Sequence, residues 1–176
     1  LERLNKTTHV VLDKTGTLTE GMMTVTDVAP ADGSATDDVL RVAASVERFS
    51  EHPVGKAICA EAVQRGLEPE DALEGFHAHP GKGVEAFRTR RSVAGEQGSN
   101  VISIAASRQL VIAGSRRFME ERSVKITSSL LELEERLSGE GKTIIHVART
   151  IGGVANVIGL IAVTDPPRPQ SAALVA

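Results

Sequence analysis

Apolar residues recur at helical spacing in three segments of the chain. Helices are therefore predicted at residues 36–49, 53–65 and 128–137. In the first of these, Val39, Leu40, Ala43 and Val46 fall on one face. Gly66 follows the second and suits a helix end, because glycine readily adopts a left-handed backbone conformation. The third is amphipathic and strongly charged, which is typical of a helix with one solvated face.

Short runs rich in β-branched and apolar residues separate these helices. They predict strands at residues 8–12, 25–30, 76–78, 84–88, 101–105, 109–112, 143–149 and 154–163. Gly152 and Gly153 lie between the last two runs and predict a hairpin turn. Residues 91–99 are polar and contain glycine and serine, so this segment is predicted to be a loop.

The composition is that of a globular domain with an aliphatic core. The 176 residues are 41% hydrophobic and 24% charged, but only 2% aromatic, with neither Trp nor Tyr. Few aromatic platforms are thus available for stacking bases, and the net charge of −3 argues against nucleic-acid binding. The single cysteine, Cys59, excludes a disulfide framework within the chain and a metal site made of paired cysteines.

The hydropathy pattern does not predict a membrane span. The longest strongly apolar run, Val154 to Val163, is interrupted by Asn156 and is far shorter than the roughly 20 residues required. The first residues, Leu1 to Lys6, do not form a signal peptide. The chain is therefore expected to be cytosolic in character, whatever it is attached to.

The run Asp13-Lys14-Thr15-Gly16-Thr17-Leu18-Thr19 carries the strongest chemical signal. It follows the predicted strand at 8–12, so a carboxylate stands at the end of a strand, where α/β sheets bind ligands. A strand-end aspartate among hydroxyl groups and a flexible glycine can attack phosphorus and form an aspartyl-phosphate. The alternative is an aspartate that merely caps a turn.

The neighbours of Asp13 refine this hypothesis. Lys14 would add positive charge near a transferring phosphoryl group, and Mg²⁺ would bridge Asp13 and the phosphate. Haloacid-dehalogenase-like phosphatases carry a second aspartate two residues after the nucleophile as general acid and base, whereas this chain has Thr15. A hydroxyl group is a poor proton acceptor at neutral pH, so an acyl phosphate here is expected to persist.

A second constellation, Ser50-Glu51-His52-Pro53, lies between the first two predicted helices. Pro53 fits the first turn of a helix and biases His52 toward an extended conformation. An imidazole and a carboxylate are thus presented together and could grip a planar heterocycle. From the spacing alone, an ordinary helix cap with an incidental histidine is the favoured alternative.

These motifs together resemble the heavy-metal-transporting P-type ATPases. The run from Asp13 to Thr19 matches the phosphorylation motif of P-type ATPases at all seven positions, and Ser50 to Pro53 resembles the nucleotide-site motif of the heavy-metal subfamily. Further matches follow in the same order along the chain: Pro80 to Val84 resembles the glycine loop, Gly114-Ser115 a Gly-Asn pair, and Asp165 to Pro169 the return segment.

The resemblance implies a role for each matching residue. Asp13 would be the phosphorylated nucleophile and a magnesium ligand, with Lys14, Thr15 and Thr17 in the phosphate environment. The implied nucleotide-binding residues are Glu51, His52, Gly81, Gly83, Val84, Gly114 and Ser115. Ser115 departs from the pattern, because it keeps a hydroxyl but loses the reach of the asparagine amide. Asp165 and Arg168 would act near a hinge between domains.

The resemblance also implies the architecture. It is an α/β (α+β) fold in which an antiparallel sheet flanked by helices, the nucleotide-binding domain, is inserted into a partial haloacid-dehalogenase-like phosphorylation domain. The expected boundaries are 1–21 for the first part of the phosphorylation domain, 22–163 for the nucleotide-binding domain and 164–176 for the return segment. Two connections, near 19–21 and 164–166, would form the hinge.

The implied function is the ATP-binding cytosolic portion of a metal-translocating pump that uses ATP and Mg²⁺. Its partners would be ATP and the rest of the same pump: the membrane helices, the actuator domain and the remainder of the phosphorylation domain. Copper is the expected cargo, with zinc, cadmium or cobalt as alternatives. The later Thr-Gly-Asp and Gly-Asp-Gly-x-x-Asn-Asp segments of the family do not occur before Ala176, so ATP binding without full turnover is expected.

Other functions are compatible with single motifs. A soluble phosphatase would share the Asp13 nucleophile, and a nucleotide sensor without a transport role would share the binding residues. His77 and His79 stand two apart on a predicted strand and could bind a metal, although no third ligand has a defined spacing. The stretch from Gly81 to Ala86 fits a relaxed dinucleotide pattern, but a predicted strand follows where that pattern needs a helix.

Overall fold

The computed structural model describes residues 11, 14–69, 73–94, 103–151 and 153–171. Its strands are β1 (Thr24–Pro30), β2 (Leu73–His79), β3 (Gly83–Ala94), β4 (Ser103–Gly114), β5 (Thr143–Ile151) and β6 (Val154–Thr164). Its helices are α1 (Thr36–Glu47), α2 (Pro53–Gln64), α3 (Arg116–Glu121) and α4 (Ser128–Gly139), preceded by a short π-helical turn, η2 (Lys14–Leu18). Asp13 and the predicted strand at 8–12, apart from Val11, lie outside the described residues.

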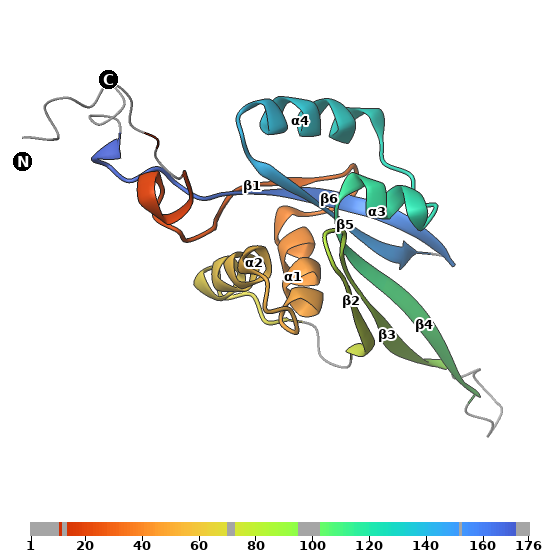
Figure 1. Ribbon diagram of the computed structural model, residues 1–176. Coiled ribbons are helices and arrows are strands. Elements are labelled where there is room, and N and C mark those ends of the chain that lie inside the picture. The colour runs from red at the N-terminus through yellow and green to blue at the C-terminus, as the bar shows by residue number, and fades with distance from the viewer. Residues whose placement is uncertain (1–10, 12–13, 70–72, 95–102, 152, 172–176) are drawn as a thin grey trace, which may run out of the picture.

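All six strands join one antiparallel sheet in the order β1-β6-β5-β4-β3-β2. Helices α1 and α2 cover one face, and α3 and α4 cover the other (Figure 1). This arrangement confirms the expected class, an antiparallel sheet flanked by helices. It also explains why β6 is buried along most of its length, since both of its faces are covered by helices.

Helix α1 is the centre of the larger core. The exposed fractions of Val39, Leu40, Ala43 and Val46 are all zero, because the sheet packs on one side of the helix and α2 on the other. The helix ends at Glu47, two residues before the predicted limit at Phe49. The predicted helices at 53–65 and 128–137 match α2 and α4 closely, as expected for amphipathic segments.

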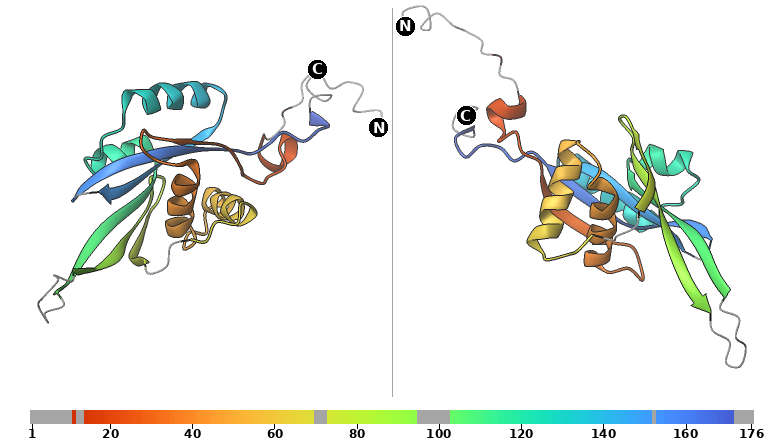
Figure 2. Two further views of the ribbon diagram at one scale, coloured as in Figure 1. Left: turned by 180° about the vertical axis from the view of Figure 1, so that it is seen from behind. Right: turned by 90° about the horizontal axis from the view of Figure 1, so that it is seen from below.

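The hairpin of β3 and β4 differs most from the sequence prediction. The two strands pair continuously from Gly83 with Gly114 to Ala94 with Ser103. Residues 91–94, predicted as loop, are therefore strand, and the two short strands predicted at 101–105 and 109–112 form one strand as far as the structure describes them. Only Val111 to Gly114 of β4 also pair with β5, so the outer part of the hairpin extends beyond the rest of the sheet (Figure 2).

The first and last described segments lie side by side at one end of the sheet (Figures 1 and 2). Thr19 forms an antiparallel bridge with Pro167, and the Glu20 amide donates to the Pro166 carbonyl oxygen over 2.9 Å. The chain thus leaves this end through η2 and returns to it after β6. Within the described ranges, no helix combines the length and the apolar character that crossing a bilayer requires.

Candidate functional site

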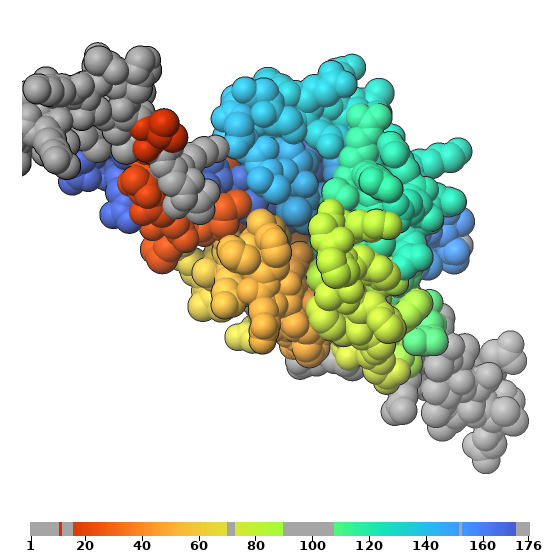
Figure 3. Space-filling model, viewed as in Figure 1, coloured from red at the N-terminus to blue at the C-terminus, as the bar shows by residue number. Residues whose placement is uncertain are grey.

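A cavity lies where three parts of the fold converge: the connection between α1 and α2, the β2–β3 turn and the start of β5. Its volume is about 290 Å³, near the lower end of the range of about 300–1,000 Å³ that is typical of small-molecule sites. Five residues predicted from the sequence motifs line it: His52, Gly81, Gly83, Val84 and Ser115. Figure 3 shows surfaces of α2, of the β2–β3 turn and of the chain near residue 140 meeting on one face of the molecule.

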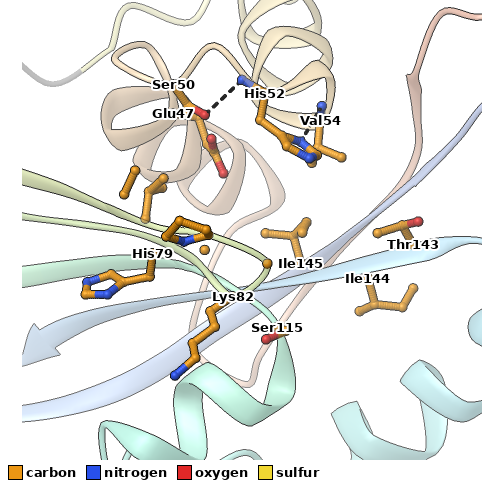
Figure 4. Close-up of a pocket in the computed structure, with 15 residues that line it drawn as sticks. Glu47, Ser50, His52, Val54, His79, Lys82, Ser115, Thr143, Ile144 and Ile145 are labelled. Atoms are coloured by element: carbon orange, nitrogen blue, oxygen red, sulfur yellow. Dashed lines mark hydrogen bonds between the residues drawn. The ribbon is translucent and has the colours of Figure 1, made fainter.

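His52 reaches the cavity because of the way α2 begins. It is the N-cap residue, with an extended backbone, and Pro53 occupies the first helical position. Its Nδ1 atom accepts a hydrogen bond from the Val54 amide over 3.3 Å, and its own amide donates to the Ser50 hydroxyl over 3.2 Å (Figure 4). Because Nδ1 is the acceptor, the neutral ring carries its proton on Nε2. His52 therefore caps α2 and lines the cavity at the same time, so the two interpretations of this motif are compatible.

The structure places the two glutamates near this motif very differently. Glu51 is exposed and is not among the residues that line the cavity. Glu47, which the motif analysis did not select, lines the cavity and is only 5% exposed. The sequence signal that could have identified Glu47 is a charged residue at the end of a helix whose apolar face is buried.

Burial raises the pKa of Glu47 to about 7, because desolvation penalises the charged carboxylate. A hydrogen bond from the Ser50 hydroxyl lowers the pKa but does not offset the burial. The carboxyl group of Glu47 points toward the middle of the cavity in Figure 4. This side chain is thus the cavity's acidic group, and it changes charge near neutral pH.

The two glycines of the β2–β3 turn serve different purposes. Gly81 has a φ of +71°, which glycine adopts without strain, and a Cβ atom there would have nothing within 4 Å. At Gly83, a Cβ atom would lie 2.3 Å from the Ala113 carbonyl oxygen and 2.5 Å from the Gly114 Cα atom. Glycine is therefore required at position 83 because β3 pairs so closely with β4 there. At Gly81 the space beside the cavity is open.

The two residues of the Gly114-Ser115 pair also have different roles: Gly114 is needed for close packing, and Ser115 lines the cavity. A Cβ atom on Gly114 would lie 2.6 Å from the Lys82 carbonyl oxygen, and Gly114 is not among the lining residues. Ser115 lines the cavity, donates its amide to the Lys82 carbonyl oxygen over 2.7 Å and caps α3 by accepting from the Phe118 amide. Ser115 thus fixes the β2–β3 turn against the start of α3.

A polar cluster supports the cavity from the side of α3. The Arg122 guanidinium group donates to both carboxylate oxygens of Glu85, and His79 Nε2 lies 3.0 Å from Glu85 Oε1. The His79 ring also packs on Phe118, with 4.8 Å between ring centroids. Among the described residues, no group of three or more His, Cys, Asp or Glu side chains could hold a metal ion, so the proposed pairing of His77 with His79 gains no third ligand.

The segment after Asp13 lies outside this cavity, at the end of the sheet where the chain returns. Asp165 accepts hydrogen bonds from the Thr19 hydroxyl over 2.6 Å and from the Gly21 amide over 2.9 Å. The Arg168 side chain donates to the carbonyl oxygens of Thr19 and Gly16 over 2.9 and 3.0 Å. These bonds clamp η2 to the return segment.

Three predicted residues of the phosphate environment lie in η2. Thr17 is exposed, whereas the structure describes only the backbone of Lys14 and Thr15. Asp13, their predicted centre, lies outside the described residues. The cavity and η2 are separate regions of the fold.

Comparison with known proteins places the chain in a family. The family model for haloacid dehalogenase-like hydrolases matches residues 7–176. The chain belongs to this family. This match covers almost the whole chain, including η2 and the return segment.

Within the haloacid dehalogenase-like hydrolases, its relatives are heavy-metal P-type ATPases. The chain is 35% identical over 175 residues to a copper-transporting P-type ATPase of Rhizobium leguminosarum bv. viciae, covering 99% of the chain and 18% of that protein. It is 37% identical over 166 residues to a silver-exporting P-type ATPase of Salmonella typhimurium, covering 94% and 17%. The chain thus spans about a fifth of the length of the curated relatives it matches.

Solved structures agree with this assignment. A zinc-transporting PIB-type ATPase in an E2·Pi state aligns with 91% of the chain and 22% of its own, with a TM-score of 0.65 and 28% identity. The N-domain of a copper-transporting P-type ATPase aligns with 80% of the chain and 99% of its own, with a TM-score of 0.55 and 27% identity. The resemblance to heavy-metal P-type ATPases inferred from the motifs is therefore confirmed.

Proposed function

We propose that the chain is the ATP-binding portion of a heavy-metal-translocating P-type ATPase and that its cavity receives the adenine end of ATP. The observation that carries this proposal is the convergence of His52, Gly81, Gly83, Val84 and Ser115, from three separate parts of the sequence, on one cavity. Its volume suits a planar base, while the triphosphate would extend past the turn into solvent.

The geometry suggests how the base is held. The His52 ring enters the cavity from one side in a fixed orientation, so it can stack on a base without a further loss of side-chain entropy. Val84 and Ile145 provide apolar wall. We assign the polar contact with the base to Glu47 rather than to Glu51, because Glu47 lies in the cavity wall.

In the parent pump, the γ-phosphate of ATP would be transferred to Asp13, with Lys14, Thr15 and Thr17 around it and Mg²⁺ neutralising the developing charge. The clamp between η2 and the return segment would position this loop. Because the cavity lies in the helix-flanked sheet and η2 at its end, closure about the segments near 19–21 and 164–166 would bring the bound phosphates to the loop. The expected boundaries at 21 and 163 belong to this proposal.

The proposed cargo is a soft transition-metal cation, with copper favoured. Several relatives are copper-transporting or copper-exporting ATPases, one is a silver exporter, and one solved neighbour transports zinc. Cargo selectivity would reside in membrane helices of the parent pump, where the metal ligands would be found. The chain itself would be the cytosolic part of that integral membrane protein.

Calorimetric titration with ATP tests the proposed binding site. We expect His52→Ala to weaken ATP binding by about 1–3 kcal/mol, because a stacking partner of the base is lost. The matched control is His77→Ala, since His77 is an exposed histidine on β2 that does not line the cavity. Equal affinities of the parent, His52→Ala and His77→Ala proteins, with circular dichroism showing intact folds, would contradict the proposed site.

A further inference from the structure

Glu47 is buried and belongs to no ion pair in the part of the chain that the structure describes. Its side chain is 5% exposed, and a Cβ atom built on Gly55 would lie only 2.5 Å from Glu47 Oε2, so the carboxyl group packs directly on the backbone of α2. The Ser50 hydroxyl is its hydrogen-bond partner.

The titratable groups that face Glu47 are engaged elsewhere. The Lys82 ammonium group pairs with Glu121 over 2.6 Å, and its side chain extends away from the cavity in Figure 4. The His79 ring is held by Glu85 and Phe118, on the side of α3.

Other titratable groups lie on or next to α2: Lys56 is exposed, Glu61 pairs with Arg65 over 2.7 Å, and His52 and Cys59 stand closer to Glu47. His52 Nδ1 accepts a hydrogen bond from the Val54 amide, so this atom is directed to the helix backbone. Burial and the nearby Glu47 raise the pKa of the Cys59 thiol, whereas Arg48, whose guanidinium group lies 4.8 Å from the centre of the Phe49 ring, lowers it. Burial is the largest influence on the pKa of Glu47 and disfavours the charged form, so this environment favours the neutral acid.

The protonation state decides which base the carboxyl group can recognise. A neutral carboxylic acid offers one O–H donor and one carbonyl acceptor, whereas a carboxylate only accepts. The Watson–Crick edge of adenine presents the N1 acceptor beside the N6 donor, which matches the neutral acid in both bonds. The N1–H and N2–H donors of guanine instead match a carboxylate.

We propose that Glu47 binds the base as a neutral carboxylic acid, so that adenine binding is coupled to proton uptake and the preference for ATP over GTP falls as the pH rises. This inference rests on the proposed function, since it assumes that the cavity receives the base of ATP. The proton comes from solvent and adds to one carboxylate oxygen of Glu47. That oxygen then donates to adenine N1, while the other accepts from the N6 amino group.

Calorimetry at pH 6 and pH 8 measures this coupling. With a Glu47 pKa of about 7 in the free protein, the affinity for ATP should fall about tenfold between these values, and binding at pH 8 should take up about one proton. Titration in two buffers of different ionisation enthalpy gives the number of protons directly. At pH 8 the phosphates of ATP are already deprotonated, so the proton uptake reports on the protein.

Glu47→Gln is the informative variant, because an amide presents the same donor and acceptor as the neutral acid but does not titrate. We expect it to bind ATP with a much smaller pH dependence and without proton uptake attributable to residue 47. His52 and His79 are present in both proteins, so the difference between the two profiles reports on residue 47. For the parent, the ratio of ATP to GTP affinity should also fall between pH 6 and pH 8.

The outcomes separate the two proposals. ATP binding that has the same pH profile in the parent and in Glu47→Gln, with no proton uptake at pH 8, would overturn the neutral-acid inference and leave the ATP site intact. Absence of ATP binding by the folded parent at both pH values would overturn the proposed function itself. If the variant does not fold, the parent alone decides the question through its ratio of ATP to GTP affinity, which should fall between pH 6 and pH 8; an unchanged ratio would overturn the inference.

Discussion

The stability of the protein should depend on pH through Glu47, and Glu47→Gln tests this without any ligand. Glutamine keeps the size and the hydrogen-bonding groups of the neutral acid but does not ionise. Burial raises the pKa of Glu47 from 4.5 to about 7. In the unfolded chain the carboxyl group ionises near the lower value, so in this window the unfolded chain binds fewer protons. The stability of the parent therefore falls as the pH rises from about 4.5 through 7.

The magnitude follows from the two pKa values. At about 1.4 kcal/mol per pKa unit, the gap between 4.5 and about 7 corresponds to roughly 3 kcal/mol at full ionisation. We expect the free energies of unfolding of the parent and of Glu47→Gln to be similar near pH 5. At pH 8 the variant should be more stable by about 2–3 kcal/mol, because it never carries the buried charge.

Urea denaturation followed by circular dichroism at both pH values measures this difference, and urea is suitable because it adds no ionic screening. Glu132→Gln is the control, since Glu132 is exposed on α4 and its replacement should not produce a pH-dependent difference. The reasoning fails if Glu47→Gln differs from the parent by the same free energy at pH 5 and pH 8, or if it is the less stable protein at pH 8.

Three further predictions concern other parts of the fold. Gly83→Ala should cost about 3 kcal/mol or more in urea denaturation, because its Cβ would meet the β4 backbone, whereas Gly81→Ala should cost only about 1–2 kcal/mol; equal costs would contradict the assigned roles. Thr19→Val should remove the hydrogen bond to Asp165 and cost about 1–2 kcal/mol locally, seen as faster amide exchange in η2, and unchanged exchange would count against the clamp. Burial lowers the pKa of His146, so the folded state favours the neutral ring and stability should be lost as the pH falls below about 6.5. His146→Leu should remove that loss in urea denaturation, and an identical decline in both proteins would refute it.

Local sequence patterns predicted α1, α2, α4 and the β5–β6 hairpin within a few residues. The helices each bury one regular face, and β6 is a continuous apolar run buried on both faces, so the spacing of apolar residues reports the conformation of these elements. The outer part of the β3–β4 hairpin lacks that signal. There β4 pairs with β3 alone, because its pairing with β5 is confined to Val111–Gly114. Helix α3, with six residues, is too short to show a period and was missed.

The candidate site was predicted unevenly for a similar reason. His52, Gly81 and Ser115 stand in contiguous motifs that could be read directly, and the structure brings them to one cavity. Glu47 belongs to the same cavity only because α1 turns into α2 beside it, which no short motif records. Glu51 stands inside the motif yet remains exposed.

The sequence by itself determined the chemistry available to this protein: a run identical to a phosphorylation motif, a histidine placed to cap α2, and glycines at a tight turn. These follow from covalent neighbours and need no folding to be recognised. Tertiary structure alone decided the strand order that sets β1 beside β6 and the burial that makes Glu47 a weak acid. Both depend on segments far apart in the chain, because strand pairing and desolvation are properties of what packs around a residue rather than of its sequence neighbours.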